Sequence, residues 1–107
     1  MRKMKIDGGL SESDMSEIIL ILQKESLVDS AFFFGSRAKG NYKKGSDVDI
    51  ALKGQHLNSE VINNIRYILN QESSMPYKFD VVNYNSINSE ELVEHINRAG
   101  KIFYSRK

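Results

Sequence analysis

Residues 35–52 read GSRAKGNYKKGSDVDIAL, and the pairing of the neighbouring strands can be inferred from this segment. The continuous apolar run AFFF at 31–34 precedes it and is typical of a buried central strand. A Gly-Ser corner and a basic loop follow, and the chain returns as a strand that carries Asp47 and Asp49. Successive side chains of a strand point to opposite faces, so these carboxylates share one face, about 7 Å apart and within reach of a common cation. We interpret the stretch as a nucleoside triphosphate and Mg²⁺ site.

Connection lengths around this stretch indicate how its strands pair. Residues 37–46 alone separate the corner from Asp47, which is shorter than the dozen or so residues of a parallel crossover. We therefore expect the strands at 28–35 and 47–53 to be antiparallel. A helix running to about Gln71 then leads to a third strand at 79–82, which permits a right-handed parallel crossover. Asp80 would then approach Asp49.

The outer segments predict two more helices and an edge strand. Ser11 or Ser13 can cap a first helix that stops near Ser26. Asn88 with Glu91 resembles a capping box for a last helix that ends at Gly100, and 101–104 is a candidate edge strand. The expected fold class is α/β (α+β), with a central mixed β-sheet flanked by helices.

Composition limits the classes of function. A length of 107 residues predicts one domain, 1–107, too small to include a separate substrate domain. The net charge of +1 argues against a general nucleic-acid coat, so no direct nucleic-acid binding is expected. Without cysteine there is neither a disulfide nor a thiolate zinc site. No apolar run approaches the roughly 20 residues of a membrane span, so we expect a cytoplasmic protein.

Each motif has a simpler reading beside the functional one. A Gly-Ser pair is often only a turn, and the P-loop pattern fails because Asn41-Tyr42 stand where Lys and Ser or Thr are needed. Arg37 lies one residue past the corner, where a planar fork can reach phosphate oxygens. A calcium loop is excluded because Ala51 and Asn58 occupy ligand positions. Four basic side chains are expected to be solvated surface residues outside the site: Lys43, Lys44, His56 and His95.

Together the motifs form a known pattern. Gly35-Ser36, ten residues, then Asp47-Val48-Asp49, with Asp80 on a later strand, resembles the signature of the DNA polymerase β nucleotidyltransferase superfamily. The SRAKG and SDVD details resemble its minimal nucleotidyltransferase branch, small proteins often paired with a HEPN-domain partner in toxin-antitoxin systems. The resemblance extends to NRAG at 97–100. Asn83-Tyr84 depart from it, because relatives often carry a further acidic residue there.

The resemblance implies a nucleotidyltransferase fold and a set of roles. Gly35 and Ser36 would hold the triphosphate, with Arg37 as a further phosphate contact. Three acids would bind Mg²⁺ and form the catalytic triad: Asp47, Asp49 and Asp80. Asp80 would also help to activate the acceptor hydroxyl. Metal ions can neutralise the polyphosphate, and without metal three carboxylates would repel one another.

The function expected from this pattern is Mg²⁺-dependent transfer of AMP from ATP to a protein hydroxyl. The expected acceptor is a HEPN-type toxin, which would make this chain the antitoxin. The alternative from another class is a nucleotide-binding regulatory subunit whose partner does the chemistry. Three acids favour the enzyme, because phosphate binding alone does not require them. Transfer to a small molecule is disfavoured by the length of the chain.

Overall fold

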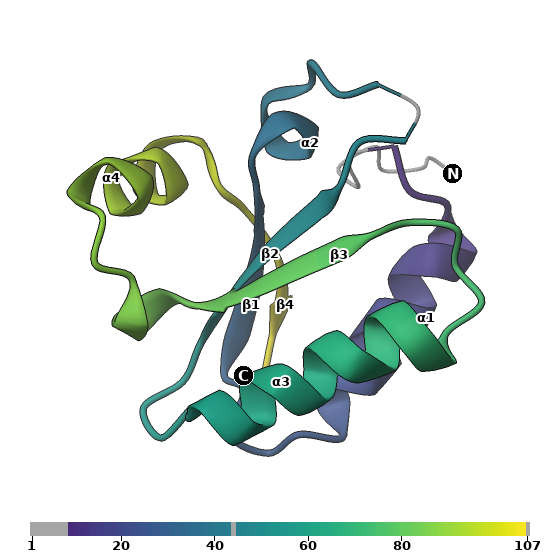
Figure 1. Cartoon of the computed structure of the whole chain (residues 1–107), viewed down its shortest axis with the longest axis horizontal. Helices are drawn as coiled ribbons and strands as arrows, with labels where there is room; N and C mark the ends of the chain where they lie inside the picture. Colours follow the sequence, from purple (N-terminus) through teal and green to yellow (C-terminus); the bar gives the residue numbers. More distant parts are fainter. Residues whose placement is uncertain (1–8, 44, 107) are drawn as a thin grey trace.

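The computed structural model describes residues 9–43 and 45–106, and in this part of the chain four strands form one mixed sheet (Figure 1). The strand order is β3-β2-β1-β4. The strands are β1 (Ser30–Phe34), β2 (Val48–Lys53), β3 (Phe79–Asn83) and β4 (Lys101–Ser105). As predicted, β1 and β2 are antiparallel and β2 and β3 are parallel. β4 forms the expected edge strand, antiparallel to β1.

Helices cover the sheet from both sides (Figure 1). On one face lie α1 (Glu12–Gln23) and α3 (Ser59–Tyr67), which continues into a π-helical turn, η1 (Ile68–Glu72). On the other face lies α4 (Glu90–Ala99), preceded by the 3₁₀ turn η2 (Tyr84–Ser86). The short helix α2 (Ser36–Lys39) follows β1 directly. This mixed sheet between helices confirms the predicted fold class.

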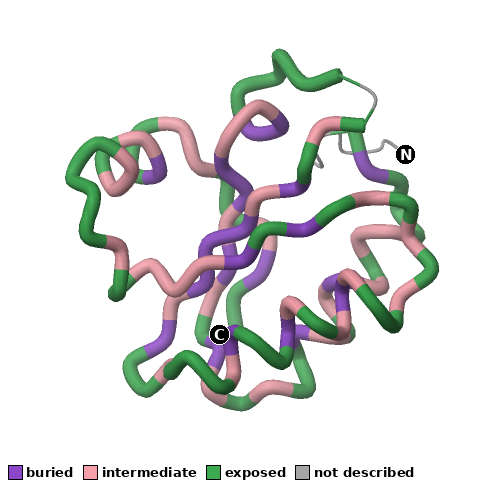
Figure 2. Tube along the Cα trace, in the orientation of Figure 1, coloured by how far each residue is buried: buried purple, intermediate pink, exposed green. Residues whose placement is uncertain are grey.

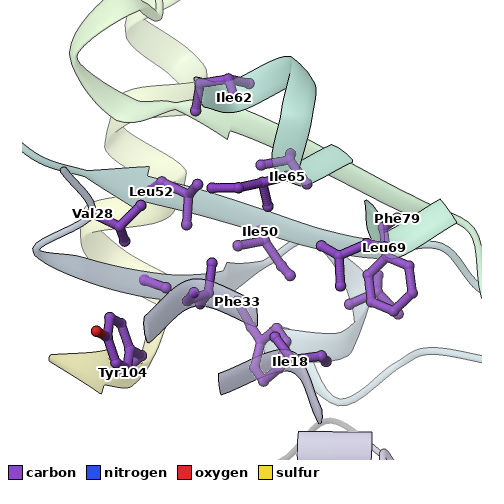
Figure 3. Packing of buried hydrophobic residues seen from close by; sticks show 14 of the residues in the cluster. Ile18, Val28, Phe33, Ile50, Leu52, Ile62, Ile65, Leu69, Phe79 and Tyr104 are labelled. Atoms are coloured by element: carbon purple, nitrogen blue, oxygen red, sulfur yellow. The ribbon is translucent and has the colours of Figure 1, made fainter. Parts of the chain in front are cut away.

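The main core lies between the sheet and the α1/α3 layer. Period-two alternation turns one set of strand side chains toward these helices, and Figure 2 shows the buried positions recurring along the strands. Figure 3 shows the resulting contacts, in which the side chains of β2 lie between the β1 and α3 side chains. Each large apolar side chain buried in this way stabilises the fold by about 1.5–3 kcal/mol. The fully buried ones include Ile18, Leu22, Phe33, Ile50, Leu52, Ile65, Leu69 and Phe79.

A smaller core lies under α4 on the opposite face. Phe34, Ala51 and Ile96 form it, with Val82 and Leu92 packed against them. The ladder pairs Ala51 with Val82, so the neighbouring pair on the same face, two residues earlier on each strand, consists of two acids, Asp49 and Asp80. The apolar cover of this face therefore gives way to carboxylates at the end where β2 and β3 begin.

Most predicted boundaries hold within a few residues, and local hydrogen bonds explain the differences. Ser11 caps α1 through a capping box with Asp14. α4 begins one residue later than predicted, because Ser89, not Asn88, accepts the hydrogen bond from the Leu92 amide. The Asn88–Glu91 capping box is therefore wrong. β1 starts at Ser30 because the Val28 amide donates instead to a turn carbonyl, that of Glu25. In the described residues no helix is both long and apolar enough to cross a membrane.

One side chain holds the start of β3. Asn70, in the π-helical turn, accepts a hydrogen bond from the Phe79 amide at 2.8 Å and donates one to the Phe79 carbonyl at 3.0 Å. The side-chain nitrogen of Asn70, Nδ2, also donates to the Arg66 carbonyl. This double bridge fixes the strand that presents Asp80 to the sheet end.

Asn70→Leu is expected to lower the free energy of unfolding by about 1–3 kcal/mol, because it leaves both polar groups of the Phe79 backbone without their partner. The matched control is Gln71→Leu, which changes the next residue of the same turn, where the side chain is exposed. Urea unfolding of the two variants measures the difference. Equal stabilities would show that the bridge does not hold β3.

Candidate active site

The corner at Gly35 has a backbone conformation and a close contact that both require glycine. Its φ is 77°, where a side chain is strained, and it turns the chain out of β1 into α2. A Cβ on this residue would also overlap Oδ2 of Asp49. The corner backbone therefore lies directly against a carboxylate. The predicted phosphate-binding corner and one of the predicted metal ligands are neighbours in the fold.

The acids predicted from the sequence lie together at the same end of the sheet. Asp49 pairs with Asp80 across the parallel β2–β3 ladder and with Phe34 across the antiparallel one. Asp47 lies just before β2, and its side chain is exposed, as is that of Asp80. Burial raises the pKa of Asp49 to about 6, and the negative charges of Asp80 and Asp47 add to the effect. The Arg37 guanidinium acts in the opposite direction.

The donor set fits a hard cation without forming a closed cage. Among residues 9–43 and 45–106, no three His, Cys, Asp or Glu side chains are placed so that they could hold a metal ion by themselves. Mg²⁺, however, is usually held by one or two carboxylates together with substrate phosphates, and the Asp49–Asp80 pair provides two. A cation there would offset both the burial and the carboxylate repulsion that raise the pKa of Asp49.

Asp49→Asn is expected to raise the free energy of unfolding at neutral pH without Mg²⁺. A pKa raised from 3.8 to about 6 means that the folded state disfavours the charged form. The gain in the free energy of unfolding should be absent below pH 3.8, grow between pH 3.8 and about pH 6, and be complete above that pH. Solvent screening at this half-buried position limits the gain to about 1 kcal/mol.

The measurement is urea unfolding of Asp49→Asn across this pH range, with the exposed Asp29→Asn as the control. Destabilisation of Asp49→Asn above pH 6 would contradict the interpretation. It would mean that the Asp49 carboxylate makes a stabilising hydrogen bond or ion pair in the folded protein and is not available to bind a cation.

Arg37 is held inside the loop that joins α2 to β2. Its side chain is only 5% exposed, and Nε and Nη2 donate to the Ser46 carbonyl at 3.3 and 3.0 Å. The guanidinium also lies 5.1 Å from the ring centroids of Tyr42 and Tyr77. These contacts hold the loop shortly before Asp47. Contact of Arg37 with phosphate stays a prediction, and the fold gives the side chain a structural role that the sequence did not indicate.

Arg37→Met should therefore lower the free energy of unfolding by about 1.5–3 kcal/mol, the range for hydrogen bonds to a charged group. The control is Arg98→Met, because Arg98 makes an exposed ion pair with Glu94 at 3.7 Å, of the kind worth about 0.5 kcal/mol or less. Thermal or urea unfolding of both variants gives the comparison. If the two variants are equally stable, Arg37 does not clamp the loop.

The prediction that His95 lies outside the site is wrong. From α4, its Nε2 accepts a hydrogen bond from the Gly35 amide at 3.0 Å, and its ring packs edge-on against Phe34. The sequence held one signal, because His95 comes three residues after Leu92 and next to Ile96, both of which pack onto the sheet. His56 and Lys43 are exposed, as expected. Lys44 lies outside the described residues.

Comparisons with known proteins agree with this architecture. The family model for "Polymerase beta, Nucleotidyltransferase" matches residues 16–107, so the chain belongs to the polymerase β nucleotidyltransferase family. The predicted superfamily is thereby confirmed. No curated protein sequence matches the chain significantly.

Solved structures share the fold at low sequence identity. A toxin-antitoxin crystallised with AMP-PNP is 23% identical, with a TM-score of 0.72, over 88% of this chain and 75% of that one. Two mutants of the MntA-HpeT toxin-antitoxin are also similar. One is 20% identical, with a TM-score of 0.70, over 87% of this chain and 74% of that one. The other is 19% identical, with a TM-score of 0.64, over 92% of this chain and 74% of that one. These likenesses establish the fold.

Proposed function

We propose that this protein is a Mg²⁺-dependent nucleotidyltransferase that moves AMP from ATP to a hydroxyl group of a partner protein. One observation carries the proposal. The Gly35 corner lies against the Asp49 carboxylate, and the parallel ladder places Asp80 beside it. A corner suited to phosphate and a pair of carboxylates suited to a divalent cation are thus adjacent, which is what transfer from a triphosphate needs.

The residues have distinct proposed roles. The corner, Gly35 and Ser36, binds the triphosphate, while Asp47, Asp49 and Asp80 hold Mg²⁺, which when bound neutralises polyphosphate charge and favours in-line geometry. Asp80 is exposed, so an incoming hydroxyl can approach it. The acceptor oxygen forms a bond to the α-phosphorus, the bond to the bridging oxygen breaks, and pyrophosphate leaves. The hydroxyl proton passes to the carboxylate of Asp80.

The proposed acceptor is a HEPN-type toxin, with this chain as its antitoxin in the cytoplasm. The structural neighbours support this pairing, since those described above were solved as toxin-antitoxins, one of them with AMP-PNP. The decisive experiment is the intact mass of a co-purified HEPN-domain partner after incubation with this protein, ATP and Mg²⁺. An added adenylyl group supports the enzyme. An unchanged partner mass, with ATP bound, would favour a nucleotide-binding regulatory subunit.

Asp80→Asn should separate chemistry from binding. Loss of a proton acceptor used mainly in the transition state lowers the rate constant without an equal loss of ground-state affinity. We expect transfer to fall at least about a hundredfold, and Mg²⁺-ATP affinity to stay within about tenfold. Single-turnover assays at saturating ATP and calorimetry measure the two quantities. The exposed Asp29→Asn is the control, and a wild-type rate for Asp80→Asn would exclude Asp80 as the base.

A further inference from the structure

We propose that His95 is a positioning residue for the nucleotide: by accepting the Gly35 N–H it holds the corner in its binding conformation, and its protonation releases the corner. The inference rests on the proposed function, because it concerns the same triphosphate site. It assigns a task to a side chain that contacts neither the carboxylates nor the acceptor hydroxyl in the proposed reaction.

The corner needs a partner of this kind. Gly35 has φ 77° and ψ −155°, in a region that glycine enters freely but that no ladder hydrogen bond holds, because β1 ends at Phe34. The Gly35 carbonyl accepts a hydrogen bond from the Lys39 amide at 3.1 Å, but this bond does not hold the preceding peptide group, which carries the Gly35 N–H. Rotation of that group would move the backbone that lies against Asp49. The hydrogen bond to His95, at 3.0 Å, fixes the orientation of this peptide group.

Helix α4 holds the hydrogen-bond acceptor, Nε2 of His95, in a defined position. Ile96, the next residue, is buried with Phe34 in the core on that face of the sheet. The imidazole packs against the Phe34 ring with centroids 6.2 Å apart and planes at 73°. The ring is thus held by packing on one side, while its nitrogen points at the Gly35 amide. Because the Gly35 N–H already donates to His95, Ser36 would make the hydrogen bonds to phosphate. Gly35 would contribute by letting the phosphate approach the backbone closely.

The bond requires neutral imidazole. A backbone N–H is a donor, so Nε2 must accept, with the ring proton on Nδ1. A second proton turns Nε2 into a donor, and two donors then face each other. The charged groups around the ring are Lys39 from α2 and Arg98 from α4, while β1 presents Phe34. Partial burial first, and then the two cations, lower the pKa of His95 below 6.5, so the bond is present at neutral pH.

Two variants and a control test the role. His95→Gln places an amide oxygen near the position of Nε2 and cannot be protonated, whereas His95→Phe keeps a flat ring and removes the acceptor. His56→Gln changes an exposed histidine in the turn after β2, at the opposite end of that strand from Asp49. At about pH 8, where imidazole is neutral, calorimetry should show Mg²⁺-ATP affinity about tenfold weaker for His95→Phe, within about threefold of wild type for His95→Gln and unchanged for His56→Gln.

NMR provides a readout that does not depend on catalysis. In an Asp49→Asn background, which removes the neighbouring titration, the Gly35 amide and the His95 ring should shift with one shared midpoint below 6.5. With His95→Gln added, the Gly35 transition should disappear. A Gly35 amide that does not follow the His95 titration overturns the inference, and so does wild-type ATP affinity in a folded His95→Phe protein. If His95→Phe does not fold, the NMR titration decides alone.

The outcome also separates this inference from the proposed function. If the wild-type protein binds ATP through a corner coupled to His95 but transfers nothing to a partner, the proposed function fails and the positioning role stands. If transfer proceeds normally and His95→Phe binds ATP like wild type, the positioning role fails alone. In the transfer assay, a positioning role at the triphosphate predicts a raised KM for ATP with kcat changed by less than about threefold.

Discussion

The close approach of the Gly35 backbone to the Asp49 carboxylate is the constraint on which the rest of the site depends. It demands a residue without a side chain at the end of β1, and the positive φ there ends the strand. It also requires the register that pairs Phe34 with Asp49, because a slip of one residue would turn the acid toward the apolar core. One contact thus links the strand pairing, the path of the loop and the position of the charge.

The same constraint explains how charge is distributed around the site. Burial against the corner makes the ionised form of Asp49 costly, and the acid beside it in the parallel ladder adds to that cost. Arg37 offsets part of it but is held in the loop by a backbone carbonyl and two aromatic rings. The negative charge at this end of the sheet is therefore only partly compensated within the described protein, and such a charge distribution favours a divalent cation.

Sequence reasoning found the parts of the fold that depend on local pattern and missed those that depend on packing. The alternation in 48–52 and the short loop before it were sufficient to predict the antiparallel pair and the place of Asp49. The α4 cap was missed by one residue because Asn88 and Ser89 are equally good cap residues. His95 was missed because its partner is 60 residues away, and only the docking of α4 brings the two together. The clamp at Arg37 was missed because a basic loop residue does not show by its spacing whether it points inward.

The position of α4 and β4 late in the chain has a consequence for how the protein is made. β1 gains its second neighbour only from residues 101–105, and the corner after it gains its hydrogen-bond acceptor only from position 95. While the ribosome is still synthesising that part, β1 has an open edge and the Gly35 N–H lacks its acceptor. A nascent chain that already bears all three acids therefore still lacks the second neighbour of β1 and the acceptor that holds the Gly35 N–H.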